Sequence, residues 1–532
     1  MKKAILLIAI LAISFQYSEA QKINKKKEFG EVHRQLTLGN YKTALMHANR
    51  LNLLEPSNAN FSYLAGLCYY YSDFDKHKAI PLLKNAVKAV STEHVENSIK
   101  EKSAPKEAWL ILGKALHFDY QFAEAIKAFE KYKSICKDEK KQKEADLNIS
   151  YCNNGIKMLA DSIEISIYSL DNLNSEYNDH TPIINGNEDM LIFTSRRKGS
   201  TGNLIDNDGV CFEDIYVSYK EGKNWTEPKK ISKNINTDQH EANVCLSPDG
   251  MELFIYKDVG GVGNLFHSYF DSIDWTVPKP LSSAINSTSN ETHATFTSNT
   301  LYFTSDRKEG IGGKDIYISK RLPTGEWSLA ENLGEIINSQ CDEEGPFIHP
   351  DGHTLIFSSK CEKSMGGYDL FITEKQQDGS WSEPKNLGYP INTTGDDVFY
   401  VLSPDGKRAY YSSIQKGGKG GRDLFVMNLL SLPERSTVVI NGVVRVAQSN
   451  EIPKDITITV TEVESNQLIG KYRPNRNTGK YTIILRNGKK YKLACEADNC
   501  AFKEEILEVP EDATYYELSK PIYLDPLGII EK

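Results

Sequence analysis

The chain has 532 residues, of which 39% are hydrophobic and 25% charged, and its formal net charge is −9 at pH 7. This length is too great for one hydrophobic core, so several domains are expected. The acidic balance argues against nucleic acid as a partner, because proteins that bind phosphates normally carry a basic surplus.

The first twenty residues have the pattern of a signal peptide. Two lysines precede an apolar run from Ala4 to Ile13, and Ser18-Glu19-Ala20 places small residues at the cleavage position. We therefore predict that residues 1–20 are a signal peptide, that the mature chain begins at Gln21, and that the protein is exported. No later segment approaches the roughly 18 to 20 apolar residues that span a bilayer, so no transmembrane segment is expected.

Residues 21–160 carry apolar side chains at helical spacing and lack strand-type alternation, which predicts paired amphipathic helices. The segment resembles a short tetratricopeptide array, in which small residues let two helices approach and large ones fill the contact. This resemblance implies a concave surface for peptides or partner proteins, whereas the residues that carry it are interpreted as core. One copy has Trp109, Leu112, Gly113, Ala125 and Phe129, and another has Tyr63, Gly66, Tyr69, Ala79, Leu83 and Ala86.

Residues 161–432 change to short alternating strands, and similar segments recur every 50 to 54 residues. Each repeat combines a strand that opens with Asp or Asn, a second strand that starts at a Trp followed by Ser or Thr (the Trp strand), and a tight turn, although some copies lack one marker. The Trp strands are expected to start at Trp225, Trp275, Trp327 and Trp381. In the Pro-Asp-Gly turns, Pro fixes φ and Gly accepts the left-handed conformation. Four strands in a repeat of this length are typical of a β-propeller blade. The strand openings are Asp214, Asn264, Asp315, Asp369 and Asp423.

The combination of Pro-Asp-Gly turns with Asp-[Ile/Leu]-[Tyr/Phe] strands resembles the TolB-type, WD40-like β-propeller repeats of periplasmic proteins. An [Ile/Leu]-Asn pair with an acid five residues after the Asn occurs five times, which predicts five blades, with six as the alternative. The first copy follows the alternating run Ile163–Tyr168, while the last repeat ends near Asn428 without a Trp strand. We therefore predict that the early run completes the last blade and closes the ring, which removes exposed strand edges.

The acids of this marker are the candidate site residues. They should stand at the start of the innermost strands, where rotational repetition places them in a ring at one mouth of the central channel. Carboxylates so close raise one another's pKa unless a cation or N–H groups compensate them, so calcium or a basic segment of a partner is a candidate ligand. The alternative is structural, with each carboxylate accepting backbone hydrogen bonds that fasten neighbouring blades. These acids are Asp179, Glu241, Glu291, Glu343 and Asp397.

The sequence has no GxSxG elbow, no HExxH motif, no phosphate-binding loop and no dinucleotide glycine pattern. A non-enzymatic protein without a cofactor is therefore predicted. The alternative is a glycan-binding or glycan-cleaving propeller, since sialidases use a propeller as their catalytic domain. Their Asp-box turn is loosely matched by Asp378-Gly379-Ser380-Trp381.

Residues 433–532 begin a third pattern, with strands expected at 438–446, 456–462, 481–486 and 491–495. Gly479-Lys480-Tyr481 and a second Gly-Lys hairpin turn make the segment resemble a carboxypeptidase-regulatory, transthyretin-like β-sandwich, which implies packing or adhesion.

None of the nine cysteines of the chain forms a CxxC pair. Cys495 and Cys500, close in sequence, are a plausible disulfide in an oxidising compartment.

These three regions in this order resemble the PorE-type periplasmic component of the type IX secretion apparatus and related OmpA-family proteins. The resemblance implies a cell-envelope scaffold of a Gram-negative bacterium, in the periplasm or at the outer membrane, that binds other envelope or secretion proteins. Two features depart from it, because the usual lipid-anchor cysteine is absent and no OmpA-like domain follows the third region. A peptidoglycan-anchoring role is therefore not expected.

Overall fold

A computed structural model of the chain describes residues 24–527, apart from 73–74, 207, 298, 377, 415–417, 430–436 and 512–515. The predicted signal peptide lies outside the described residues. The chain divides into two compact units, the first comprising the residues up to Ala160 with Ile205–Val210, and the second comprising the remainder. Within the described ranges, no helix has both the length and the apolar character required to cross a membrane.

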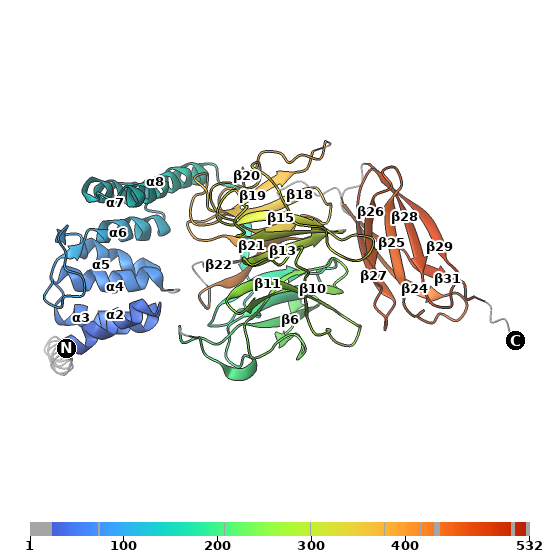
Figure 1. The fold of residues 1–532 in the computed structure, drawn as a ribbon, viewed down its shortest axis with the longest axis horizontal. Helices are drawn as coiled ribbons and strands as arrows, with labels where there is room; N and C mark the ends of the chain where they lie inside the picture. The colour runs from blue at the N-terminus through green and yellow to red at the C-terminus, as the bar shows by residue number, and fades with distance from the viewer. Residues whose placement is uncertain are drawn as a thin grey trace, which may run out of the picture. The chain divides into compact units, whose positions relative to one another are not determined.

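The described part of the first unit contains seven α-helices, and each packs against the next in the chain (Figure 1). Several begin at an asparagine whose side chain accepts a backbone N–H of the first turn, as Asn58 does from Phe61 at 3.2 Å. The predicted helical region is thus confirmed. The helices are α2 (Lys25–Thr37), α3 (Tyr41–Leu54), α4 (Ala59–Tyr71), α5 (Ala79–Ala86), α6 (Glu107–Phe118), α7 (Phe122–Ile135) and α8 (Glu139–Ala160).

Close helix contacts depend on the glycines of the repeat pattern. A Cβ added to Gly113 of α6 would lie 2.5 Å from the ring of Phe129 on α7, and one on Gly66 of α4 would lie 2.7 Å from Leu83 on α5. Phe129 and Leu83 are fully buried. The small and large residues of the pattern therefore meet in the contacts that the sequence predicted.

The repeats of the second unit form five antiparallel sheets in the described part of the chain. In chain order the first has β4 (Asp179–Ile184), β5 (Met190–Ser195), β6 (Asp214–Glu221), β7 (Asn224–Trp225) and β8 (Lys229–Lys230). The second has β9 (Glu241–Leu246), β10 (Glu252–Val259), β11 (Val262–Tyr269) and β12 (Lys279–Pro280). The third has β13 (Glu291–Thr297), β14 (Thr300–Ser305), β15 (Asp315–Lys320) and β16 (Glu331–Asn332). The fourth has β17 (Glu343–Ile348), β18 (Thr354–Ser359), β19 (Asp369–Glu374) and β20 (Lys385–Asn386), and the fifth has β21 (Val398–Leu402), β22 (Arg408–Ser413), β23 (Asp423–Asn428) and β3 (Ser166–Ser169).

The fifth sheet takes its outermost strand from the start of the unit. β3 pairs antiparallel with β23, with Tyr168 opposite Val426. The innermost strands contact one another in the order β4, β9, β13, β17 and β21, and β21 contacts β4 again. The early run therefore pairs where it was predicted to, although the strand begins at Ser166. Ile163 instead donates its N–H to the carbonyl of Tyr389, at 3.2 Å.

The expected Trp strands are shorter than predicted. Trp275, Trp327 and Trp381 each make only an isolated bridge, and the fourth strand that follows each has two residues. Their side chains are nonetheless buried, and the Trp327 ring meets that of Phe254, on the preceding sheet, edge-on at 6.5 Å. The repeated Trp thus reflects packing between neighbouring sheets more than a hydrogen-bonded ladder.

The last hundred residues form two further sheets around an apolar core that includes Ile458 and Ile483. The four expected strands are present, and the structure adds β26 and β29 to β31. β26, β30 and β31 are short, and β29 is a charged edge strand of the kind that resists association. One sheet has β24 (Thr437–Val446), β27 (Lys480–Arg486), β30 (Tyr516–Ser519) and β31 (Ile522–Leu524). The other has β25 (Thr457–Glu462), β26 (Leu468–Tyr472), β28 (Lys489–Glu496) and β29 (Lys503–Val509).

The bond considered between Cys495 and Cys500 is not formed in the structure, where both are buried free thiols. Cys495 lies opposite Lys503 in the β28–β29 ladder, whereas Cys500 makes its own bridge with Pro526. The two residues are therefore neighbours along the chain but not partners across a ladder.

Candidate functional site

The five acids lie where the sequence placed them, at the start of the innermost strands. Four are the first residue of their strand, and Asp397 directly precedes β21. All five are at most 1% exposed. Each accepts hydrogen bonds from the backbone N–H and the hydroxyl of a Ser or Thr four residues earlier, as Glu291 does from Ser287 at 2.9 and 2.8 Å. The other donors are Ser175, Thr237, Ser339 and Thr393.

The asparagine that precedes each Ser or Thr reaches back to the preceding sheet. The side chain of Asn236 accepts from the N–H of Ile215 and donates to its carbonyl, both at 2.9 Å. Asn, Ser or Thr, and acid thus form a junction motif, in which the Asn binds one sheet and the acid fixes the start of the next. The other four asparagines make the same pair of bonds, to Leu265, Ile316, Leu370 and Leu424.

Cations compensate three of these buried carboxylates. Arg197 lies 2.7 Å from Asp179, Arg307 lies 3.1 Å from Glu291, and Lys257 lies 3.1 Å from Glu241. The two arginines also donate to the backbone carbonyls of Leu173 and Ile285, respectively, at 2.7 and 2.8 Å. They therefore clasp the loop that leads into their own sheet.

Glu343 and Asp397 are held instead by neutral donors. Glu343 accepts from the hydroxyls of Ser339 and Ser359 at 2.7 and 2.8 Å. Burial raises the pKa of Glu343, and it raises the pKa of Asp397 to about 7. The five junctions thus share one hydrogen-bond pattern, but within the described residues only those of Asp179, Glu241 and Glu291 include a cation that balances the carboxylate.

Each carboxylate accepts hydrogen bonds from the turn that precedes its own strand, and three of the five also pair with a cation. Within the described ranges, no group of three or more His, Cys, Asp and Glu side chains is arranged to hold a metal ion. The contacts favour the structural interpretation of the acids, and calcium binding stays a prediction.

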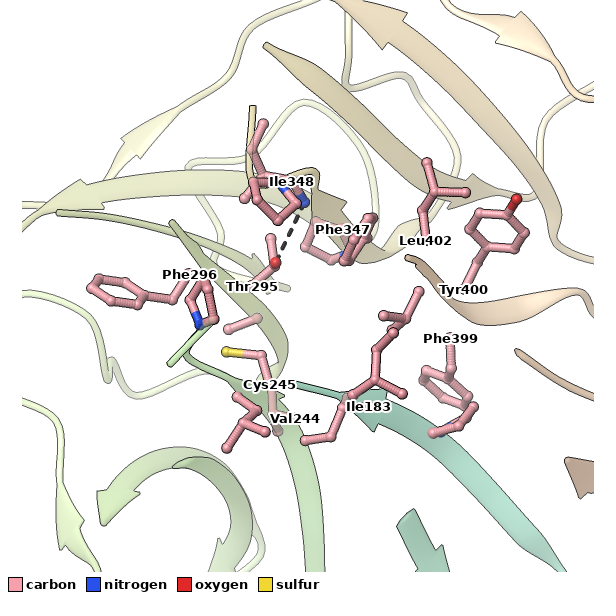
Figure 2. A pocket seen from close by; sticks show the side chains of 18 of the residues that line it. Ile183, Val244, Cys245, Thr295, Phe296, Phe347, Ile348, Phe399, Tyr400 and Leu402 are labelled. Atoms are coloured by element: carbon pink, nitrogen blue, oxygen red, sulfur yellow. Dashed lines mark hydrogen bonds between the residues drawn. The ribbon is translucent and has the colours of Figure 1, made fainter. Parts of the chain in front are cut away.

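The innermost strands line a cavity of about 70 Å³, which Figure 2 shows. Side chains from all five sheets point into it, and the hydroxyl of Thr295 accepts a hydrogen bond from the N–H of Ile348 at 3.3 Å. Ile484 of β27 also lines it. Among the described residues that line it there is no Asp, Glu, Lys or Arg. Many are apolar, among them Ile183, Val244, Phe296, Phe347, Val401 and Leu402.

Phe399 lies at one end of this cavity in a conformation that large residues rarely adopt, with φ +59°. Its ring lies 4.7 Å from that of His293 on the third sheet and 6.1 Å from that of His180 on the first. An aromatic ring from the fifth sheet therefore reaches across the channel. Burial lowers the pKa of His293 to about 4, so this imidazole is neutral at pH 7.

The sequence analysis did not predict that Phe399, His293 and His180 lie together, or that charged residues lie beside them. His180 lies 3.3 Å from Glu213, and the ammonium group of Lys314 pairs with Glu344. Burial raises the pKa of Glu213, but hydrogen bonds from His180 and His240 outweigh it and lower that pKa overall. These positions differ in residue type from one repeat to the next, so no repeated signal marks them.

No protein-family model matches the chain, and no curated protein matches it. Solved structures with a similar backbone include TolB from Acinetobacter baumannii, at 14% identity over 63% of this chain and 67% of that one, with a TM-score of 0.30. A putative TolB from Agrobacterium tumefaciens is 16% identical over 51% and 98%, with a TM-score of 0.28. An α-L-arabinanase from Penicillium chrysogenum, complexed with arabinobiose, is 10% identical over 51% and 100%, with a TM-score of 0.33. Similarities this distant carry no argument about function.

Proposed function

We propose that the protein is a non-enzymatic, exported scaffold of the cell envelope that binds other envelope or secretion proteins, in an assembly of the type IX secretion or outer-membrane kind. In this proposal residues 21–160 are a tetratricopeptide array, residues 161–432 a five-bladed TolB-like propeller, and residues 433–532 a carboxypeptidase-regulatory-like sandwich. The cycle of contacts among the innermost strands and the pairing of β3 with β23 support a closed ring of five blades.

The filling of the channel is the observation that carries the proposal. Glycoside hydrolysis commonly needs two carboxyl groups that face the substrate, separated by roughly 5 to 9.5 Å. Here the repeated carboxylates hydrogen-bond their own turns, the cavity between the strands is mostly apolar, and the Phe399 ring crosses one end. Such an interior favours a structural role for this region over the hydrolysis of a glycoside.

Exposed aromatic residues on the first unit fit a protein-binding role. Tyr71 is 40% exposed, and its ring stacks on that of Tyr41 at 5.3 Å. Tyr120 is exposed to a similar degree. Tyrosine supplies a large contact area at a low entropic cost and is enriched at protein interfaces. These residues are the first candidates for contact with a partner.

The test is a pull-down from envelope fractions with the full mature chain, in the original protein and in a Tyr71→Ala, Tyr120→Ala double variant. We expect secretion or outer-membrane proteins to be enriched, and the double variant to lose most of that enrichment. Met46→Ala, at another exposed apolar position of the same unit, is the control and should keep it. Retention on polysaccharide alone would contradict the proposal.

The glycan and calcium alternatives have their own measurements. Release of sugar from an oligosaccharide panel would favour a glycan-cleaving protein. Calcium that binds the native state must raise the melting temperature. No shift at millimolar calcium removes the calcium site.

A further inference from the structure

The fourth sheet departs from the arginine clasp of the first and third. In those two sheets the arginine stands two residues after the serine that faces the acid, as in Ser195 and Arg197 or in Ser305 and Arg307. In the fourth sheet Ser359 faces Glu343 in the same way, and the residue two positions later is Cys361. The position that carries a cation in two other sheets thus carries a thiol here.

A second cysteine, Cys341, lies two residues before the strand that pairs with β18. The β17–β18 register pairs Glu343 with Ser359, and the N–H of Lys360 donates to the carbonyl of Asp342 at 3.2 Å. Both cysteines lie just beyond this pair, and one further step of the same antiparallel register would place Cys341 opposite Cys361. Opposed Cα atoms in such a ladder are about 4.5 to 5.5 Å apart, which lies inside the range of about 4.4 to 6.8 Å that disulfides span.

The backbone on both sides is held in place. The carbonyl of Cys341 accepts the N–H of Gly313 at 3.0 Å, and the carbonyl of Cys361 accepts that of Ser364 at 3.0 Å. Both cysteines are free thiols in the structure, as are the other seven, and the Cys361 Sγ lies 3.9 Å from the Ser364 hydroxyl. These two are partly exposed, whereas the other seven are buried. Burial raises the pKa of Cys341, and the Cys361 thiol adds to this effect, which shows that the two groups are close enough to interact.

We propose that Cys341 and Cys361 form a disulfide that fastens the fourth junction where an arginine fastens the first and third. The two thiols lose two protons and two electrons as the S–S bond forms. The electrons pass to the disulfide of an oxidant, such as oxidised glutathione or a thiol-disulfide oxidoreductase, which is reduced to two thiols. A thiolate attacks that disulfide, and its partner cysteine then resolves the mixed disulfide. Cys495 and Cys500 lack the shared register.

Peptide mapping of the whole wild-type protein tests this pairing. The protein is incubated folded in a glutathione buffer, its remaining thiols are alkylated after unfolding, and it is digested with trypsin. Cleavage after Arg321, Lys360 and Lys363 gives peptides 322–360 and 361–363. We expect these two peptides to remain joined until reduction. If the thiols of both cysteines are instead alkylated after oxidation, the proposal is wrong.

Melting supplies the second readout. Cross-linking restricts the unfolded chain, so the oxidised protein should melt roughly 5 °C or more above the reduced one. Cys341→Ser and Cys361→Ser should each abolish that difference, while Cys495→Ser should keep it. A redox-dependent shift that persists in Cys341→Ser would overturn the assignment.

Discussion

Asp397 shows how one buried carboxyl group sets a pH dependence. Its pKa is raised to about 7, chiefly by burial, although Thr393 donates an N–H and a hydroxyl to it. A carboxyl group with a raised pKa in the folded state contributes stability as the protonated form. That contribution is fully present below the ordinary value of about 3.9 and is lost as the pH rises through about 7.

We therefore predict that the melting temperature falls between pH 5 and pH 8, and that the fall is smaller in Asp397→Asn. A tenfold change in a protonation equilibrium corresponds to about 1.4 kcal/mol, so the variant should lose roughly 2 kcal/mol or more of the pH-dependent change. Some fall should remain, because burial also raises the pKa of Asp369 to about 8. Thermal melting across this range, monitored by circular dichroism, measures both proteins, and identical slopes would contradict the prediction.

Asp179→Asn is the matched control at another junction. Asp179 pairs with Arg197 at 2.7 Å, so its replacement leaves a largely buried guanidinium group without its carboxylate. This variant should be destabilised by roughly 2 to 4 kcal/mol at pH 7. Equal effects of the two substitutions at that pH would show that the junctions do not differ in charge.

The pair of helices α6 and α7 depends on the absence of a side chain at Gly113. Replacement of this glycine by alanine would place a Cβ 2.5 Å from the buried Phe129 ring, so the ring or a helix must shift. A shift of α6 or α7 would disturb their contacts with α5 and α8. Gly113→Ala should therefore destabilise the first unit by roughly 1 to 3 kcal/mol, in spite of the higher helix propensity of alanine. Urea unfolding followed by helical circular dichroism measures the change.

Gly30→Ala separates packing from propensity. Gly30 lies in α2 and has nothing within 4 Å of an added Cβ. This substitution should be neutral or stabilise the protein by up to about 1 kcal/mol. If both substitutions stabilise the protein, the higher helix propensity of alanine outweighs the contact at Gly113, and the packing argument is wrong.

The sequence predicted the features that recur at a regular spacing. Glycine in a helix contact, a Pro-Asp-Gly turn and an Asn that caps a neighbouring strand each recur because one backbone geometry recurs. The features that it did not predict belong to one sheet and are not repeated in the others. Phe399 takes a left-handed conformation at a register shift in β21, where the corresponding residues of the other sheets include Thr181 and Gly345. No periodicity reveals such a residue, since its surroundings are assembled from different sheets.

At the scale of the second unit, β3 completes the fifth sheet, and the proposed ring would close through it. Leu170 donates its N–H to the carbonyl of Leu424, so alternation of the antiparallel ladder makes Tyr168 and Val426 the next hydrogen-bonded pair. The Tyr168 side chain is 56% exposed, so a substitution here acts mainly through the backbone. Tyr168→Pro removes the N–H and should cost roughly 1 to 3 kcal/mol, whereas Tyr168→Ala keeps it and should be nearly neutral.

Hydrogen exchange shows where that cost falls. If β3 closes the ring, its loss frees the outer edge of β23, and the amides of β23 should exchange faster in Tyr168→Pro while those of β15, in the third sheet, change less. The junction of Asn174 with Leu424 would be weakened at the same time, because it joins the same two ends of the ring. Uniform protection of β23 in both variants would mean that the fifth sheet holds its edge without β3, and that other contacts between the first and fifth sheets, such as the Asn174 junction and the Arg408–Glu188 pair, are sufficient.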